Sequence, residues 1–217
     1  MSSKGEVEIV EPTAAERAHA RRVAEARATV PDLELGVVVE MSAALALASE
    51  AQVSITVVLL RACALALAEH PRANGAYRDG RFELYSSVNI ALALERSSPV
   101  ILDAAETSLA ELHGEIEQLT QRAERGELRP PELSGATFTF ADLGALGVDR
   151  PSIVITPPQA AAVAAGTVRA VPTVSNGAIV PGHEMVLALS ADGRILNGTQ
   201  AGAFIASVKQ LLEVSRL

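Results

Sequence analysis

The sequence predicts an α+β fold in which a mixed β-sheet carries its helices on one side. Helical and strand-like segments are mixed along the chain without strict strand–helix alternation. Apolar residues make up 49% of the 217 residues and charged residues 20%, a balance that suits a large core and excludes general disorder. The length fits one domain, expected over residues 13–217, with residues 1–12 as a disordered lead.

Capping signals and apolar spacing predict five helices. Thr13–Glu16 and Ser108–Glu111 are capping boxes, so helices are expected to begin there. The most apolar stretch, Val53–Ala68, carries Arg61 in its middle and is shorter than the roughly 20 residues that span a bilayer, so it predicts a buried helix. The expected helices cover about 13–28, 42–49, 54–70, 108–123 and 199–214, with Ser42 and Ser54 capping the second and third.

Strands are expected where β-branched residues cluster or apolar residues alternate. The dipeptide Asp79-Gly80, with an arginine on each side, is a turn signal. The expected strands cover 35–40, 87–94, 137–140, 153–155, 160–168 and 185–190.

Charge and composition exclude several function classes. The chain has 18 Lys and Arg against 26 Asp and Glu, a net charge of −8, and only 3% aromatic residues, which argues against nucleic-acid binding. The polar start, Met1–Glu11, is not a signal peptide, and no segment predicts membrane insertion. A single cysteine, Cys63, allows no internal disulfide and fits a cytoplasmic location. No Cys/His spacing predicts a metal site.

The apolar content consists of Ala, Val and Leu with few large rings. Two explanations stay open at this point: closely packed oligomer surfaces, or codon bias in a high-GC gene.

The segments Thr137–Gly144 and Ser190–Gly198, together with six shorter ones, stand in a characteristic order and spacing. In this arrangement they resemble the catalytic core domain of the dihydrolipoyl acyltransferases of 2-oxoacid dehydrogenase complexes. Thr137–Gly144 resembles that family's TFTISNLG segment, and Ser190–Gly198 resembles its SxDHRVVDG segment. The other matching segments are Glu25–Pro31, Pro71–Asn74, Val88–Ala93, Pro99–Ile101, Ser108–Leu112 and Pro157–Ala160.

The resemblance implies a chloramphenicol-acetyltransferase-like two-layer sandwich. It also implies a homotrimer with active sites between subunits, and often a larger cubic assembly of trimers. Members of the family transfer an acyl group between a lipoyl-lysine arm and coenzyme A. The chain leaves no room for a lipoyl domain or a peripheral-subunit-binding domain, so it is not expected to carry a swinging lipoyl arm of its own.

Two family residues that carry the chemistry are missing here. The family uses a histidine as general base and a serine or threonine of a neighbouring subunit as oxyanion donor. Gly193 stands at the histidine position and Ala141 at the serine position, and neither side chain can do this chemistry. Asn197 occupies a position where the family has Asp or Asn.

The neighbours of these positions are expected to be structural. Asp192 and Arg194 predict an ion pair at the site, and Gly198 a close approach at the start of the last helix. His183 is a candidate substitute base if an antiparallel arrangement brings it near Gly193.

Three functions therefore stay open. The chain is a non-catalytic scaffold that self-assembles or joins a genuine acyltransferase core, a working acyltransferase with substituted residues such as His183, or a coenzyme-A or acyl-CoA binding module. Restoring the site by Gly193→His with Ala141→Ser is expected to give measurable acyl transfer if the pocket is otherwise intact. The polar segment Glu95–Pro99 stands where the family has apolar residues, which puts that pocket in doubt. The apolar end, Leu211–Leu217, either docks trimers together or packs on its own core.

Overall fold

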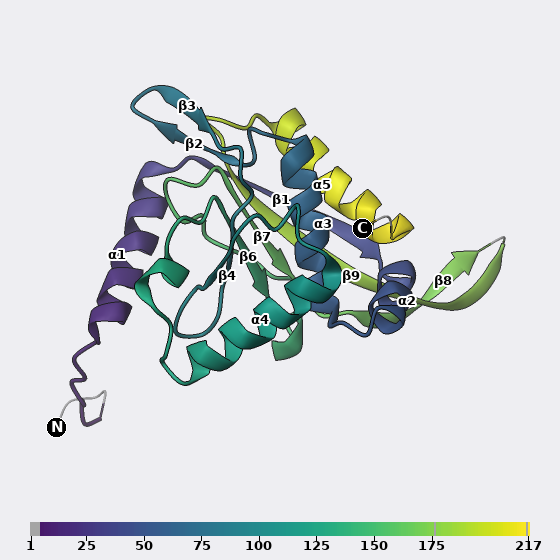
Figure 1. Ribbon diagram of the computed structural model, residues 1–217, viewed down its shortest axis with the longest axis horizontal. Coiled ribbons are helices and arrows are strands. Elements are labelled where there is room, and N and C mark those ends of the chain that lie inside the picture. The colour runs from purple at the N-terminus through teal and green to yellow at the C-terminus, as the bar shows by residue number, and fades with distance from the viewer. Residues whose placement is uncertain (1–4, 176, 216) are drawn as a thin grey trace.

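The computed structural model describes residues 5–175, 177–215 and 217. Its centre is a seven-stranded sheet of order β1-β9-β7-β6-β4-β5, with β8 paired to β9, and a separate hairpin joins β2 and β3 (Figure 1). Strands β4, β6 and β7 run parallel to one another and the other pairs are antiparallel, so the sheet is mixed. The strands are β1 Asp32–Glu40, β2 Gly75–Arg78, β3 Arg81–Leu84, β4 Ile90–Leu92, β5 Val100–Ile101, β6 Phe138–Asp142, β7 Ala161–Ala165, β8 Arg169–Ser175 and β9 Ala178–Asp192.

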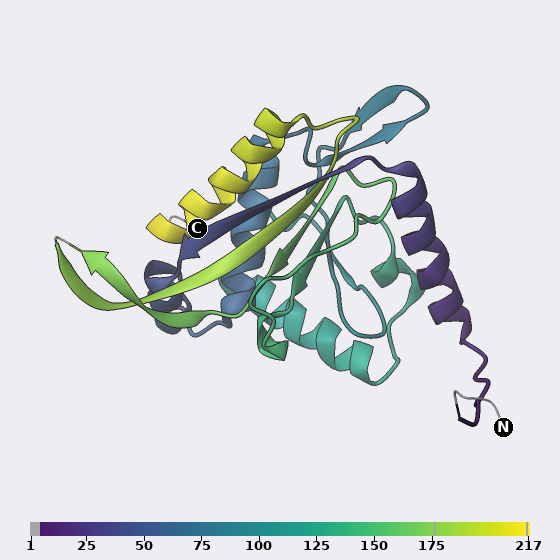
Figure 2. The ribbon, with the colours of Figure 1, turned by 180° about the vertical axis from the view of Figure 1, so that it is seen from behind.

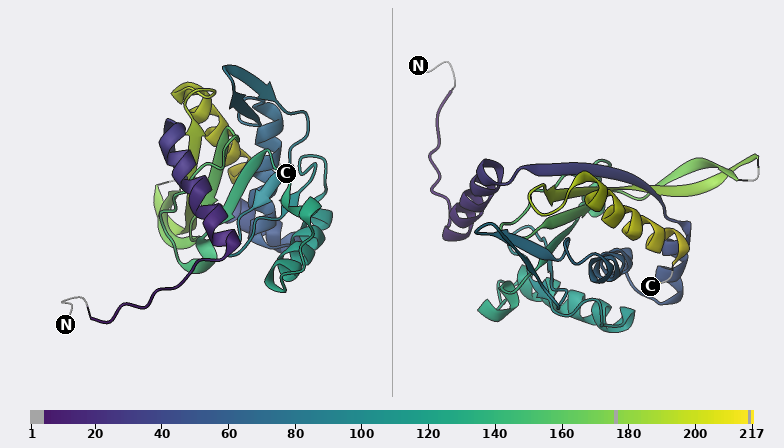
Figure 3. Two further views of the ribbon diagram at one scale, coloured as in Figure 1. Left: turned by 90° about the vertical axis from the view of Figure 1, so that its left-hand side faces the viewer. Right: turned by 90° about the horizontal axis from the view of Figure 1, so that it is seen from above.

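Helices α2 to α5 cover one face of this sheet, and α1 lies apart from them at its end (Figure 3). The predicted α+β class with helices on one side is therefore confirmed. The sheet face opposite α2 to α5 is called the open face below. The helices are α1 Ala14–Thr29, α2 Ser42–Glu50, α3 Ile55–Glu69, α4 Leu109–Glu124 and α5 Gly198–Val214, with 3₁₀ turns η1 Pro130–Leu133 and η2 Gly144–Leu146.

Local capping explains where two helices begin. The capping boxes at Thr13 and Ser108 are both present, since each hydroxyl oxygen accepts from the backbone N–H of the third helical residue, Glu16 or Glu111. The carboxylate of that glutamate in turn accepts from the backbone N–H of the capping residue. The predicted cap at Ser42 is wrong, whereas Ser54 does stand at the N-cap position of α3. Ser42 is the first helical residue and its hydroxyl donates to Glu40 at 2.5 Å, while the side chain of Ser54 makes no capping bond.

The core lies between the helices and the sheet. Helix α3 contributes nine buried residues, and burial raises the pKa of the Cys63 thiol to about 12, which makes it an inert core residue at neutral pH. The rings of Phe138 and Phe204 meet edge to face at 5.9 Å and join β6 to α5. Within the described ranges, no helix is long and apolar enough by itself to cross a membrane, although α2 and α3, bent by 111°, pass that test as a pair.

Strand β9 is the main departure from the predicted elements. It covers 15 residues, whereas the sequence predicted only residues 185–190 in its second half, because Pro181 and Gly182 interrupt the apolar pattern. The expected strand over 153–155 is irregular backbone, although Ile155 is buried. β-branched residues thus marked burial there and not a strand. The expected strand over 87–94 is shortened to β4.

The chain before α1 has no helix or strand from Gly5 to Pro12. Residues 1–4 of the expected lead lie outside the described residues. Val7, Ile9 and Val10 are more than 70% exposed, so this segment adds nothing to the core. The helix that follows is attached to the sheet mainly through Ala26, its one buried residue, and through an ion pair of 2.8 Å between Arg27 and Asp32.

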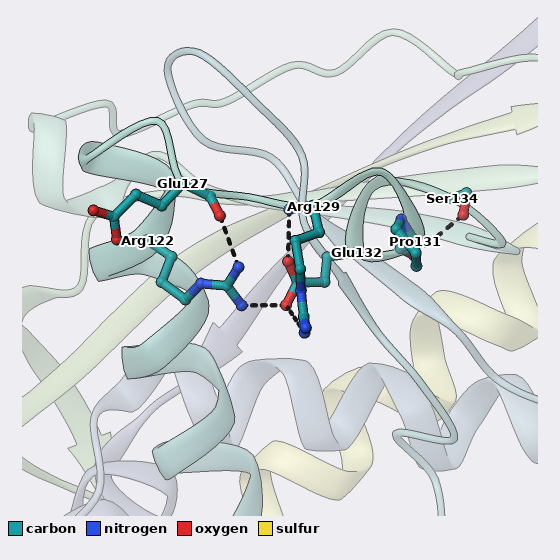
Figure 4. Close-up of polar contacts among 6 residues, drawn as sticks. All are labelled: Arg122, Glu127, Arg129, Pro131, Glu132 and Ser134. Carbon is teal, nitrogen blue, oxygen red and sulfur yellow. Dashed lines mark hydrogen bonds and ion pairs between the residues drawn. The ribbon is translucent and has the colours of Figure 1, made fainter.

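A polar cluster joins the end of α4 to the turn η1 (Figure 4). The Glu132 carboxylate accepts from the guanidinium of Arg129 at 3.0 Å, from the Arg129 backbone N–H at 2.7 Å, and from Arg122. Arg122 also donates to the carbonyl oxygen of Glu127 at 2.7 Å. The bonds from Arg129, and then the charge of Arg122, lower the pKa of Glu132 from its ordinary 4.5 to about 2.

This cluster gives a pH-dependent prediction. Since the folded pKa of Glu132 is depressed, its contribution to stability is present above about pH 4.5 and is lost as the pH falls toward 2. Glu132→Gln is expected to lower the free energy of unfolding at neutral pH, and the deficit relative to wild type should shrink between pH 4.5 and 2. Urea unfolding at a series of pH values measures this deficit.

The matched control is Glu95→Gln, at an exposed glutamate that has no ion-pair partner among the described residues. It should show no deficit at any pH. A deficit for Glu132→Gln that stays constant down to pH 2 would contradict the assignment.

Candidate functional site

The turn that follows β9 carries the residues singled out by the sequence. Asp192 is 2% exposed, and its carboxylate accepts from Nε of Arg194 at 2.9 Å and from Nη2 at 2.7 Å. The backbone N–H of Arg194 donates to the same carboxylate at 2.9 Å. The expected ion pair is therefore present, and its hydrogen bonds raise the pKa of Arg194.

The β2–β3 hairpin packs on this turn through alternating rings and guanidinium groups. Arg194 lies 4.7 Å from the ring centre of Tyr77, and Arg72 lies 4.9 Å from that of Phe82. The two rings are 6.1 Å apart. Arg72 also donates to the carbonyl oxygen of Ile195 at 3.4 Å, so the stack holds both sides of the turn.

Gly193 has no room for a side chain. Its N–H donates to the carbonyl oxygen of Pro31 at 2.9 Å, and a Cβ built on Gly193 would lie 2.7 Å from that same oxygen. The backbone φ is not in the left-handed region, so the requirement for glycine here comes from space and not from conformation. The backbone that leads into β1 therefore occupies the direction that a side chain at this position would take.

Ala141 lies far from Gly193 in one chain. Strand register aligns Ala141 with Ala164 and Ala164 with Ala188, so Ala141 is level with a residue five positions before Gly193 on β9. This places the two positions roughly 17 Å apart along the strands and about 10 Å apart across them. One chain alone does not assemble the two positions into a site.

Ala141 belongs to a row of small residues on the open face. Ala141, Ala164, Ala188 and Gly36 are aligned in register across β6, β7, β9 and β1. The β1–β9 end of this row forms the floor of a groove of about 450 Å³. The residues that line this open-face groove include Gly36, Val38, Val186, Ala188, Arg150 and Ile153.

A second groove, of about 570 Å³, is more polar. It lies beside β3 and the start of β6, and its lining includes Arg78, Tyr85, Ser86, Ser87, Asn89 and Thr137. Arg78 forms an ion pair of 3.6 Å with Glu83 at its edge.

Two predicted site residues are placed differently from what was expected. His183 and Asp192 lie in the same continuous strand, nine residues or roughly 30 Å apart, so no antiparallel return brings His183 to Gly193 within one chain. The close approach expected at Gly198 is also wrong, because a Cβ there would meet nothing within 4 Å. Asn197 caps α5, and its side chain accepts from the N–H of Gln200 at 2.9 Å.

Sequence reasoning missed the ring stack. The sequence feature that could have revealed this stack is the turn at Asp79-Gly80, which joins the two strands of the hairpin. Tyr77 and Phe82 lie close to it on either side. It also missed Asp142, next to Ala141, which accepts from the Thr56 hydroxyl at 2.6 Å and the Gly144 N–H at 3.0 Å and so joins the start of α3 to the end of β6. Across residues 5–175, 177–215 and 217, no group of three or more His, Cys, Asp or Glu side chains is arranged to hold a metal ion.

The profile of the family described as 2-oxoacid dehydrogenases acyltransferase (catalytic domain) matches residues 4–217. The chain belongs to this family. A dihydrolipoyllysine-residue acetyltransferase component of the pyruvate dehydrogenase complex from Zymomonas mobilis is 32% identical over 210 residues, covering 91% of this chain and 48% of the relative. This acyltransferase-family chain thus spans about half the length of the curated relatives it matches.

Solved acyltransferase cores share the fold. A dihydrolipoamide acetyltransferase from Azotobacter vinelandii aligns with a TM-score of 0.90 at 26% identity, covering 99% of this chain and 95% of that one. The cubic core of a pyruvate dehydrogenase multienzyme complex gives the same values. A chloramphenicol acetyltransferase at 14% identity, covering 94% of this chain and 99% of its own, has a TM-score of 0.54, which confirms the predicted chloramphenicol-acetyltransferase-like fold.

For the Azotobacter vinelandii enzyme, a serine, a histidine and an asparagine were investigated for their role in the catalytic mechanism. The separations between those three residues equal the separations between Ala141, Gly193 and Asn197 in this chain.

The crowding at Gly193 gives a prediction with an internal control. Gly193→Ala forces the Pro31 carbonyl group to move and is expected to lower the free energy of unfolding by about 1–3 kcal/mol. Gly198→Ala, in open space four residues after the crowded turn, should change it by no more than about 0.5 kcal/mol. Denaturant unfolding compares the two, and equal stability of both variants would contradict the crowding.

Proposed function

We propose that this chain is a non-catalytic member of the acyltransferase family that serves as a structural core component. The observation that carries the proposal is the closed position at Gly193, where the Pro31 carbonyl oxygen takes the place of a side chain. The equal separations in the Azotobacter vinelandii enzyme support it, since they align its histidine with Gly193 and its serine with Ala141.

The proposed lack of catalysis follows from the two small residues Gly193 and Ala141. Transfer of an acyl group to a thiol needs a base that removes the thiol proton and a donor that stabilises the oxyanion. A base contributes about 10²–10⁴-fold and one oxyanion donor about 10²–10³-fold. Gly193 and Ala141 supply neither, and His183 lies too far along β9 to act as a base at Gly193 of its own chain.

The proposed role is assembly. The relatives include the cubic core of a multienzyme complex, and on this chain the two small residues Gly36 and Ala188 lie on an accessible part of the open face that another surface can approach closely. We therefore propose a homotrimer, with larger cubic assembly or joining to a genuine acyltransferase core as the ways in which it contributes to a complex.

The activity of the purified chain tests the loss of chemistry. Transfer of an acetyl group from acetyl-CoA to dihydrolipoamide should be at least about 10⁴-fold slower than for the Azotobacter vinelandii enzyme under the same conditions. A rate within about tenfold of that enzyme would contradict the proposal. Calorimetric titration with coenzyme A, run in parallel, distinguishes a scaffold from a chain that binds coenzyme A without turnover.

The double substitution Gly193→His with Ala141→Ser tests how completely the site has closed. Because the new Cβ would meet the Pro31 oxygen, the structure predicts a rate within about tenfold of the unsubstituted chain, and not the measurable restoration that an open pocket would give. A gain of about 10²-fold or more in the same assay would show that the Pro31 backbone moves aside and that the closure is not the barrier.

A further inference from the structure

The second groove, called the polar groove below, lies beside the β2–β3 hairpin, which projects from one end of the sheet (Figures 1 and 2). Its volume of about 570 Å³ is in the range of small-molecule sites. Gly193, Ala141 and Asn197 are not among its lining residues. The polar groove is therefore a separate place on the chain from the altered site discussed above.

Hydrogen bonds within the chain hold both walls of the polar groove in place. On one side, the buried Asn74 amide donates to the carbonyl oxygens of Tyr85 and Ser87 at 3.0 and 2.9 Å. On the other side, the Thr137 hydroxyl accepts from the Asn89 N–H at 3.0 Å and donates to the Asn89 carbonyl oxygen at 3.1 Å. The walls are thus formed before a ligand arrives, which lowers the entropy that binding would cost.

Three side chains in the lining keep donors for a ligand. Ser86 and Ser87 are exposed, and neither hydroxyl forms a hydrogen bond with another residue in the described part of the chain. The Arg78 side chain is 53% exposed, and its contact with Oε2 of Glu83 is 3.6 Å, which is longer than a hydrogen bond. A ligand that brings acceptor oxygens would satisfy these groups.

The charge of the polar groove selects the kind of acceptor. Arg78 is the one charged side chain among the described residues of the lining, although the whole chain has a net charge of −8. The planar guanidinium pairs with a carboxylate through two parallel hydrogen bonds. Glu83 lies at the edge of the groove, where its carboxylate also accepts from the Tyr85 hydroxyl at 3.2 Å, so it would repel a second negative charge on a ligand. The pattern favours a ligand with one negative charge.

The polar groove also offers apolar surface. Leu84 is 52% exposed and lines the groove together with Pro158. We propose that the polar groove binds a small organic acid. Its carboxylate lies on the Arg78 guanidinium within reach of the serine hydroxyls, and its apolar part contacts Leu84 and Pro158. This inference goes beyond the proposed function and does not depend on it.

Titration with simple acids, followed by saturation-transfer NMR, tests the site. Benzoate and hexanoate should bind with a Kd on the order of 1 mM. Benzamide, which has the shape of benzoate without its charge, should bind at least about tenfold more weakly, and Arg78→Gln should weaken benzoate binding to a similar extent.

The matched control is Arg81→Gln. Arg81 is exposed and lies opposite Arg78 in the hairpin, but it does not line the polar groove. Its loss should change the Kd for benzoate by no more than about twofold, because an exposed charge outside the site is screened by solvent.

Glu83→Gln tests where the carboxylate lies. Removing the negative charge next to Arg78 should tighten benzoate binding by about two- to fivefold. Unchanged or weaker binding would contradict a carboxylate on Arg78. In the wild type, phenyl phosphate should bind no more tightly than benzoate, and a clear preference for it would contradict the assignment to an acid with one charge.

The remaining outcomes also decide the inference. No binding of either acid to the wild type overturns it, and so does an equal loss in Arg78→Gln and Arg81→Gln, which would show attraction to the hairpin's general charge. Each of these results leaves the proposed loss of acyl transfer and the proposed core role in place, because neither proposal uses the polar groove.

Discussion

The structure depends on the ladder between β1 and β9 and on how that ladder ends. Nine residue pairs, from Asp32 with Asp192 to Glu40 with Glu184, hold the two strands in register. One more backbone bond, from Gly193 to Pro31, continues the ladder past the last pair. A Cβ at position 193 would lie 2.7 Å from the Pro31 carbonyl oxygen that accepts this bond, so the bond and a histidine at position 193 exclude each other in this geometry.

The other contacts of the turn after β9 lie next to this bond between Gly193 and Pro31. Asp192 is buried because Arg194 satisfies its carboxylate, and the Arg194 guanidinium lies over the ring of Tyr77. The hairpin that presents Tyr77 is in turn joined to the turn by Arg72. A buried ion pair keeps its geometry only when its neighbours satisfy both partners, so these contacts form a structural junction between sheet, hairpin and α5. Strand β9 therefore contributes to this junction, to the open-face groove and to the hairpin with β8.

Sequence reasoning succeeded where the physical cause is local. The capping boxes at Thr13 and Ser108 need only residues three positions apart, and the ion pair between Asp192 and Arg194 joins residues two positions apart. The resemblance to the family is also confirmed, whereas the assignment of Ala141 and Gly193 as altered positions stays a prediction. Short-range signals of this kind are contained in the sequence itself.

Sequence reasoning failed where the cause is a contact between distant segments. The crowding at Gly193 comes from Pro31, and the stack over the turn comes from Tyr77 and Phe82, none of which is near it in the chain. His183 was placed wrongly because the full length of β9 could not be read through Pro181 and Gly182. Motif positions are therefore readable from sequence, whereas the space around them is set by tertiary packing.

Hydrogen exchange at the Gly193 amide measures most directly whether its bond to Pro31 holds the carbonyl oxygen in the direction that a side chain at position 193 would take. The account predicts slow exchange, comparable to the Met41 amide, which donates to His183 at 2.9 Å beside the same ladder. Exchange as fast as that of an exposed loop amide such as Ser152 would contradict it, because the Gly193 N–H would then be free of Pro31 and the site open to a side chain.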